Sequence, residues 1–243
     1  MAWETEGYLS IILLAVLVIG FSWGLDRLYG RILPLNVLYY GIRMPGIVLH
    51  ELAHIAGCLV TGAGIKKVVF FSKEGGSVTY TKPGIPVIGD VIISAAPLLL
   101  LPLVLALLTW IFPAFCQCTL AGTLPATVTG DLPFQVTAIL AGLFFENLIL
   151  RFNPWFLLYL YLCVTIVLSL APSRQDFANA AIGIVIIAGA CVLVVLSGIP
   201  PALSLLGQAL SLLTYPFMLG LIFEIAAGVA AIPFIFSYWL RSG

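Results

Sequence analysis

Long apolar runs separated by short polar segments dominate the 243-residue chain. The last run, 203–240, exceeds the roughly 20 residues of one helical crossing and contains Pro216 and Pro233, so it forms either one long kinked helix or two short ones. The six runs before it are residues 8–24, 33–62, 91–112, 134–150, 155–170 and 178–198. This pattern predicts an α-helical polytopic membrane protein with about seven or eight transmembrane helices, built as a single integral membrane domain over residues 1–243.

Polar residues and prolines mark where the first two runs change. Residues 1–7 carry two acids and no base, so the first run lacks the positive start of a signal peptide and is predicted to be a transmembrane helix. Asp26, Arg27 and Arg31 then predict a short polar loop. Inside the second run, Pro45-Gly46 predicts a kink or a break.

A different pattern occupies residues 65–82. Segments 65–71 and 77–81 are rich in β-branched and aromatic residues, and Glu74-Gly75-Gly76 between them favours a turn. We expect a β-hairpin just after the second run. It is either a plain surface connector or an edge strand that pairs with an extended substrate segment.

Composition agrees with a bilayer environment, since 62% of the residues are hydrophobic and only 8% are charged. Ten basic and ten acidic residues balance, so the charge gives no indication of a nucleic-acid partner. The five cysteines are an odd and mostly intramembrane set, which argues against a disulfide framework, and we interpret Cys116 and Cys118 as incidental.

The two histidines of the chain both lie in the second run, in the sequence His50-Glu51-Leu52-Ala53-His54. Residues four apart stack on one face of a helix, so both imidazoles can converge on one ion while Glu51 stands beside them. Histidine and glutamate are costly in hydrocarbon and mark a functional site there. This HExxH pattern is that of zinc hydrolases and predicts a Zn²⁺ site inside the membrane.

A catalytic zinc usually has a third protein ligand. The acidic candidates are Asp90, Asp131, Glu146, Asp176 and Glu224. Counting crossings from the 26–32 side leaves Asp131 and Asp176, with Glu224 undecided because the last run is ambiguous. Asp176 follows Pro172 at the start of a predicted helix, where a carboxylate also serves as an N-terminal charge.

An HExxH on a transmembrane helix, followed about 120 residues later by an aspartate after a proline, resembles the site-2 protease family of intramembrane zinc metalloproteases, especially its small prokaryotic members. The resemblance covers residues 34–180, a protease core that leaves the spans at 200–240 as additions. It implies His50, His54 and Asp176 as zinc ligands and Glu51 as the general base that activates water. The substrate would be a membrane-anchored protein cut within or near a transmembrane segment, in a prokaryotic cell membrane.

Leu168 and Phe177 stand where the aspartate motif of that family has Asn and Gly, so a residue that binds the oxyanion is not obvious. The candidates are Ser169, Thr165 and Asn179.

Two alternatives remain open. One is another membrane zincin, in which Glu146 or Glu224 supplies the third ligand. The other is a non-enzymatic transporter or metal-binding scaffold, with Asn147, Gln208 and the same two glutamates lining an ion path. Replacing Glu51 by Gln distinguishes a protease from the non-enzymatic alternative, because only a protease would lose cleavage while keeping the metal.

Overall fold

The computed structural model describes residues 2–33, 36–71, 76–117 and 131–242. Most of these residues are helical, and they include one two-stranded sheet. The elements are α1 (Ala2–Ile32), α2 (Asn36–Thr61), β1 (Ile65–Val69), β2 (Ser77–Tyr80), α3 (Ile88–Cys116), α4 (Leu132–Phe144), a π-helical segment (Phe145–Leu150), α5 (Pro154–Leu168), α6 (Arg174–Ser197) and α7 (Pro200–Ser242).

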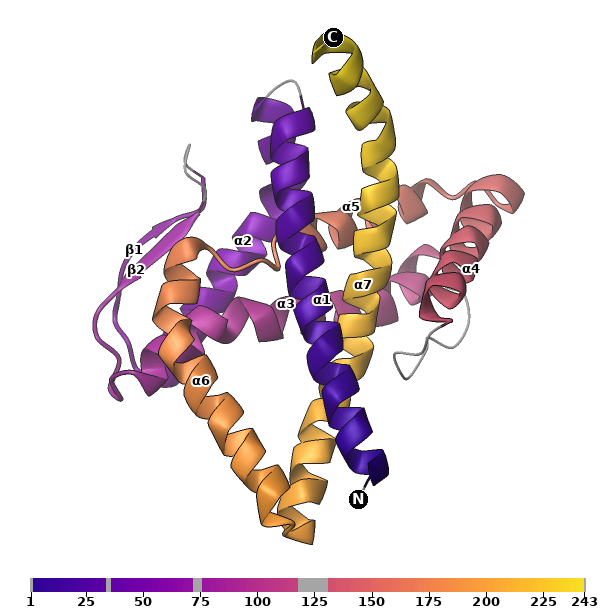
Figure 1. The fold of residues 1–243 in the computed structure, drawn as a ribbon. Helices are drawn as coiled ribbons and strands as arrows, with labels where there is room; N and C mark the ends of the chain where they lie inside the picture. The colour runs from indigo at the N-terminus through magenta and orange to yellow at the C-terminus, as the bar shows by residue number, and fades with distance from the viewer. Residues whose placement is uncertain (1, 34–35, 72–75, 118–130, 243) are drawn as a thin grey trace.

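The longest packed pair is α1 with α7, which run side by side in the same direction (Figure 1). Helices α3 and α5 cross behind this pair and contact α7, while α2 packs against α3 and α5. Helix α6 descends from the middle of the molecule to the start of α7 (Figure 1). The hairpin and α4 lie on opposite sides of the molecule (Figure 1). Helix α2, which carries the histidines, contacts α3, α5 and the hairpin.

An aromatic cluster joins three of these helices. The ring of Tyr159 on α5 lies 5.1 Å from that of Phe112 on α3 and 5.5 Å from that of Phe223 on α7. The Tyr159 hydroxyl also hydrogen-bonds Thr109 Oγ1 at 2.9 Å. Offset and edge-to-face aromatic contacts combine burial with a preferred geometry. They hold the crossing of α3, α5 and α7 in a fixed arrangement.

The helical membrane architecture predicted from the sequence is confirmed in its coarse form. Four described helices are long and apolar enough to cross a membrane, namely Ser10–Ile32, Tyr39–Thr61, Ile88–Ala114 and Pro200–Leu240. The count of seven or eight is not confirmed. Helix α5, for example, has 15 residues and spans about 22 Å at 1.5 Å per residue, short of the roughly 30 Å of hydrocarbon.

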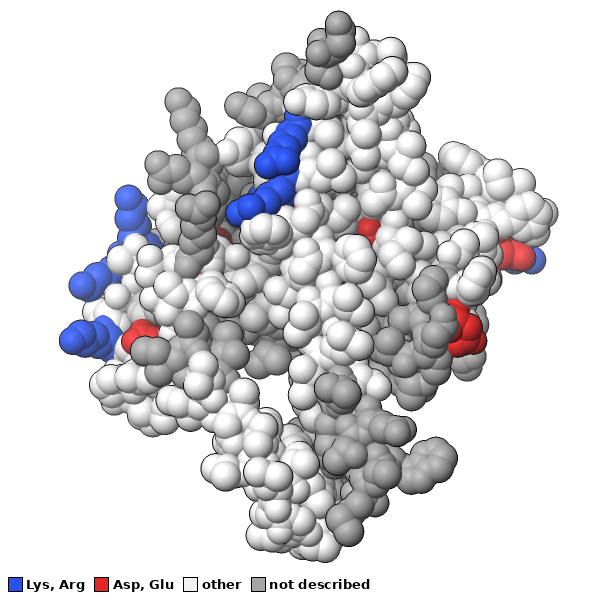
Figure 2. Space-filling model, in the orientation of Figure 1, with Lys and Arg blue, Asp and Glu red and all other residues white. Residues whose placement is uncertain are grey.

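Most of the face in Figure 2 carries no charge, and cationic side chains gather over the hairpin and part of α1.

The predicted polar loop at Asp26, Arg27 and Arg31 is wrong, because these residues belong to α1. Partners elsewhere let the helix continue: Asp26 pairs with Arg43, and the Arg27 guanidinium stacks 3.6 Å from the Trp23 ring centroid. A cation over an indole and a closed ion pair both reduce the cost of charge in an apolar setting.

The prolines also interrupt the helices less than the sequence predicts. Helix α2 is not broken at Pro45, and α7 continues through Pro216 and Pro233 as one element of 43 residues. Packing against neighbouring helices compensates for the backbone hydrogen bonds that proline removes in membrane helices. Of the two forms left open for the last run, the structure has the single long helix.

The predicted β-hairpin is confirmed, with β1 and β2 antiparallel and Val68 opposite Val78. Residues Glu74 and Gly75 of the predicted turn lie outside the described residues. A register shift between Ile65 and Lys67 marks an irregularity in β1. Cys118 also lies outside the described part, and Cys58, Cys163 and Cys191 are free.

Candidate metal centre

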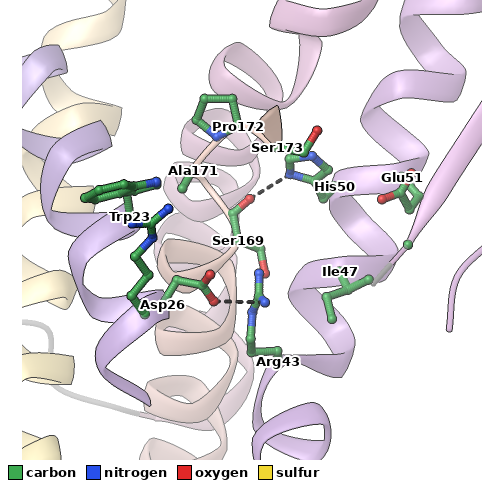
Figure 3. Close-up of a pocket in the computed structure, with 12 residues that line it drawn as sticks. Trp23, Asp26, Arg43, Ile47, His50, Glu51, Ser169, Ala171, Pro172 and Ser173 are labelled. Atoms are coloured by element: carbon green, nitrogen blue, oxygen red, sulfur yellow. Dashed lines mark hydrogen bonds and ion pairs between the residues drawn. The ribbon is translucent and has the colours of Figure 1, made fainter. Parts of the chain in front are cut away.

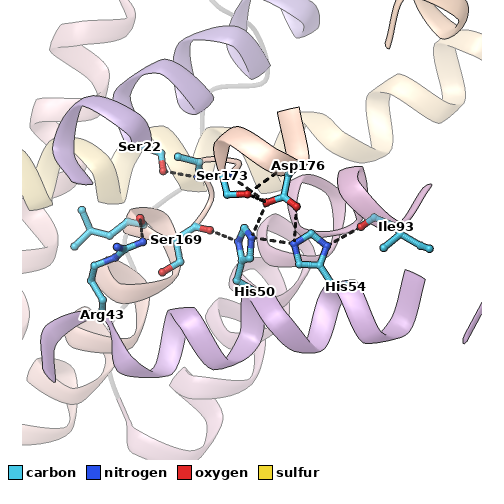
Figure 4. A network of polar contacts seen from close by, with 10 residues as sticks. Ser22, Arg43, His50, His54, Ile93, Ser169, Ser173 and Asp176 are labelled. Atoms are coloured by element: carbon cyan, nitrogen blue, oxygen red, sulfur yellow. Dashed lines mark hydrogen bonds and ion pairs between the residues drawn. The ribbon is translucent and has the colours of Figure 1, made fainter. Parts of the chain in front are cut away.

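Helix α2 brings His50 and His54 onto one face, as their spacing predicts, and both side chains are buried. The Nε2 atoms of the two imidazoles lie 3.2 Å apart. Asp176, from the first turn of α6, places Oδ1 3.3 Å from His54 Nε2 and Oδ2 3.6 Å from His50 Nε2 (Figure 4). The structure therefore brings these three residues together from segments more than 120 positions apart.

The other ring nitrogens determine the state of the imidazoles. His50 Nδ1 lies 2.7 Å from Ser169 O, and His54 Nδ1 lies 2.8 Å from Ile93 O. A carbonyl oxygen only accepts, so each Nδ1 carries a proton, and Nε2 is the ring nitrogen left to bind a metal. Two imidazole nitrogens and a carboxylate therefore converge on one point, as the ligands of a metal ion do.

A metal ion fits this donor set. Ligands about 2.0–2.1 Å from a tetrahedral ion lie about 3.3–3.4 Å apart, close to the 3.2 Å between the two Nε2 atoms and the 3.3 Å between His54 Nε2 and Asp176 Oδ1. One ligand atom from each of His50, His54 and Asp176 lies within 4.8 Å of the others, and this is the one such group of histidine, cysteine or acidic side chains found among the described residues. The carbonyls of Ser169 and Ile93 supply the outer contacts that metal-bound histidines need for a fixed tautomer and orientation.

Asp176 also caps its own helix. Ser173 Oγ accepts a hydrogen bond from Asp176 N at 3.1 Å, and Asp176 Oδ2 accepts from Ser173 N at 3.0 Å and from Ser173 Oγ at 2.6 Å. This is a reciprocal capping box. The N-terminal role predicted for Asp176 is confirmed, and the cap fixes the orientation of a carboxylate whose oxygens face the two imidazoles. Burial raises the pKa of the Asp176 carboxyl, but His50, His54 and Ser173 outweigh burial and lower the pKa well below its usual range, so the group stays ionised.

Two glycines allow α2 to approach its neighbours at these outer contacts. A Cβ at Gly46, one turn before His50, would lie 2.5 Å from Ser169 Oγ and 2.6 Å from the Thr165 carbonyl carbon. A Cβ at Gly57, three residues after His54, would lie 2.8 Å from Ile93 Cα. Sequence reasoning interpreted Gly46 only as part of a kink and did not consider Gly57. The signal was present, since small residues on the face of a membrane helix that carries the histidines indicate close helix packing.

The segment between α5 and α6 is held from two sides (Figure 4). From α1, Ser22 Oγ donates to Val167 O at 2.6 Å and accepts from Ala171 N at 2.9 Å. From α2, Gly46 N donates to Thr165 Oγ1 at 2.9 Å. These bonds fix the peptide that carries Ser169 O and the turn that leads to Asp176.

Glu51 lies beside the histidines, 5% exposed, and its Oε2 has no hydrogen-bond partner among the described residues. The backbone of the hairpin passes directly over it, because a Cβ at Gly76 would lie 2.5 Å from Glu51 Oε1. Glu51 lines two cavities. One, of about 310 Å³, is bordered by residues 76–80 of the hairpin, and the other, of about 260 Å³, is bordered by Asp26, Arg27 and Arg43 (Figure 3).

The other acidic candidates lie elsewhere. Asp131 precedes α4, where its Oδ2 accepts from Gln135 Nε2 at 2.6 Å. Asp90 lies in the first turn of α3 and Glu146 in the π-helical segment after α4. Glu224 is buried in α7, and neither of its carboxyl oxygens has a hydrogen-bond partner in the described part of the chain. None of these four belongs to the group formed by His50, His54 and Asp176.

Of the residues considered for the oxyanion, Asn179 lines the hairpin-side cavity and Ser169 the other. Thr165 Oγ1 is engaged by Gly46 N. Asn179 Oδ1 accepts from Gln175 Nε2 at 2.9 Å, an arrangement that turns the carbonyl end of the amide toward Gln175.

Fold and site together define a helical membrane protein with a buried side-chain group that could hold a metal ion. None of the protein-family models, curated proteins or solved structures compared with the chain matches it. What the site does must therefore be inferred from its own geometry.

Proposed function

We propose that this chain is an intramembrane zinc metalloprotease that hydrolyses peptide bonds within or near transmembrane segments of membrane-anchored substrates. The observation that carries the proposal is the convergence of His50 Nε2, His54 Nε2 and the Asp176 carboxylate. Glu51 lies beside them, and its Oε2 has no hydrogen-bond partner among the described residues. Two imidazoles and a carboxylate match the ligand types of catalytic zinc sites, which leave a position open. The likeness of the HExxH and aspartate segments to the site-2 protease family supports the same activity.

His50, His54 and Asp176 would hold the zinc, which when bound supplies Lewis acidity to the peptide carbonyl. Glu51 would take a proton from the attacking water and deliver it to the leaving amine. General acid–base catalysis of this kind contributes about 10²- to 10⁴-fold to rate. The carbonyls of Ser169 and Ile93 keep both Nδ1 atoms protonated and would hold both Nε2 atoms in the orientation that binds the zinc.

The two cavities that meet at Glu51 suit the two reactants. Consecutive residues 76–80 line the hairpin-side cavity, as a strand does when it presents an edge instead of one face. Because an intact helix keeps its carbonyls hydrogen-bonded, a transmembrane substrate must be unwound before attack, and an edge strand can pair with the extended form. The second cavity, with Asp26, Arg27 and Arg43 on its wall, provides a polar route for water.

The deciding experiment compares Glu51→Gln with wild type in zinc content and in cleavage of a single-span substrate reconstituted in vesicles. We expect about one zinc per chain in both and a loss of at least 10²-fold in cleavage rate for the variant. Glu146→Gln, which removes a carboxylate away from the site, should retain both properties.

Zinc content in Asp176→Ala and Asp131→Ala tests the ligand set, and we expect loss of zinc in the first variant alone. Full-rate cleavage by Glu51→Gln would refute the role of Glu51 as the general base. Zinc binding without any cleavage by wild type would instead favour a metal-binding scaffold.

A further inference from the structure

Arg43 lies on α2 seven residues before His50, so the two side chains project from the same side of the helix. Its Nη1 lies 2.8 Å from Asp26 Oδ1 and donates to Tyr39 Oη at 2.7 Å. Tyr39 Oη in turn donates to Asp26 Oδ1 at 2.7 Å. These contacts tie α1 to α2 close to the candidate metal centre (Figure 3).

The other terminal nitrogen of Arg43 reaches α5. Nη2 donates to Leu168 O at 3.4 Å, and Leu168 is the last residue of that helix. The final carbonyls of a helix have no partner within the helix, and a cation near them is favoured by the helix dipole. Ser169 O, the next carbonyl, accepts from His50 Nδ1 at 2.7 Å. Two side chains of α2 therefore bind successive carbonyls at the end of α5 (Figure 4).

Stability alone does not explain the ion pair. Its side chains are 19% and 27% exposed, so both charges are largely removed from water. Apolar residues of similar size are often as stabilising as a buried ion pair. What the guanidinium adds is a fixed planar fork that reaches an acidic side chain, a hydroxyl and a backbone carbonyl at once.

We propose that Arg43 is a positioning residue for the metal ligand His50. By binding Leu168 O, it holds the end of α5 so that the adjoining Ser169 carbonyl keeps the His50 imidazole in the tautomer and orientation that present Nε2 to the metal. This inference rests on the metal site in the proposed function, but it concerns metal binding and does not require proteolysis. Loss of the hydrogen bond that orients a metal-binding histidine typically lowers metal affinity 10- to 100-fold.

The test measures zinc affinity of the full chain in detergent by competition with a chromophoric chelator, together with the visible spectrum of the Co²⁺ form. Arg43→Met should weaken zinc binding by about 10- to 100-fold and alter the Co²⁺ bands. Arg43→Lys keeps the charge but not the fork and should fall between Arg43→Met and wild type. The matched control is Arg27→Met, because Arg27 borders the same cavity but stacks on Trp23. It should leave both readouts unchanged.

Chemical rescue distinguishes positioning from a general loss of folding. Added ethylguanidinium can enter the cavity beside position 43, and it should restore zinc affinity to Arg43→Ala but not to Asp176→Ala.

Wild-type affinity and an unchanged Co²⁺ spectrum in Arg43→Met would overturn the inference, as would equal effects of Arg43→Met and Arg27→Met. If Arg43→Met does not fold, Arg43→Lys with wild-type affinity and spectrum overturns it too. Zinc binding by wild type without cleavage would refute the protease proposal alone, whereas absence of zinc binding would refute both.

Discussion

Replacing Gly46 by Ala tests whether the approach of α2 to α5 sets the geometry of the candidate metal centre. The new Cβ would lie 2.5 Å from Ser169 Oγ and 2.6 Å from the Thr165 carbonyl carbon, and ordinary contact begins at 3.4 Å. The Thr165 carbonyl oxygen lies closer still, and the backbone of Thr165 cannot rotate away as a flexible side chain can, so the helices must separate by about 1 Å or more. Overpacking of this kind costs about 1–3 kcal/mol.

The same displacement acts on His50, one turn further along α2. Its Nδ1 lies 2.7 Å from Ser169 O, and an added 1 Å takes the pair beyond hydrogen-bonding distance. The hydrogen bond from Gly46 N to Thr165 Oγ1, 2.9 Å long, is lost with it. Without its outer contact the imidazole is free to turn, and we expect zinc affinity to fall about 10- to 100-fold.

Zinc titration against a competing chelator and thermal unfolding in detergent measure the two effects. Gly41→Ala is the matched control, because Gly41 lies on the same helix and its Cβ would meet nothing within 4 Å. Alanine is favoured over glycine within a helix by about 0.5–1 kcal/mol, so this control should be neutral or slightly stabilising. Unchanged zinc affinity and unfolding temperature in Gly46→Ala would refute the close approach and the positioning argument built on it.

Two further substitutions probe the other outer contacts. Gly57→Ala, whose Cβ would lie 2.8 Å from Ile93 Cα, should weaken zinc binding by displacing the Ile93 carbonyl from His54, and a zinc titration equal to that of Gly41→Ala would contradict this. Ser173→Ala removes the cap of α6 and should lower stability by about 1 kcal/mol and weaken zinc binding, whereas Ser197→Ala, at the far end of α6, should leave zinc affinity at its wild-type value.

The helices and the hairpin could be predicted because their signals are local. Apolar runs near 20 residues and β-branched clusters around a turn need no knowledge of the rest of the chain. The predicted helix boundaries were wrong where a contact with a distant part of the chain decides whether the helix continues. Helix α1 continues past Asp26 because Arg43, on another helix, neutralises its charge. Helix α7 continues through Pro216 and Pro233 because neighbouring helices pack around it.

At the candidate site too, local relations could be predicted from the sequence and contacts between distant segments could not. The spacing of His50 and His54 placed both imidazoles on one face, since helical periodicity alone fixes that relation. From the sequence, Asp176 was only one of several acidic candidates for the third metal ligand, because its position depends on how the α5–α6 turn folds back onto α2. The contacts that orient the histidines use backbone carbonyls of Ser169 and Ile93, which no side-chain pattern reveals.

By itself, the sequence determined a helical membrane protein with a buried histidine pair and one hairpin, because hydrophobic length, helical period and turn chemistry act over a few residues. Tertiary structure alone decided that Asp176 meets those histidines and that Gly46 and Gly57 bring α2 against the carbonyls that orient them. It also decided that Arg43 binds the end of α5. Each of these contacts joins positions between 36 and 126 residues apart, and only the packing of the helices brings them within a few ångströms.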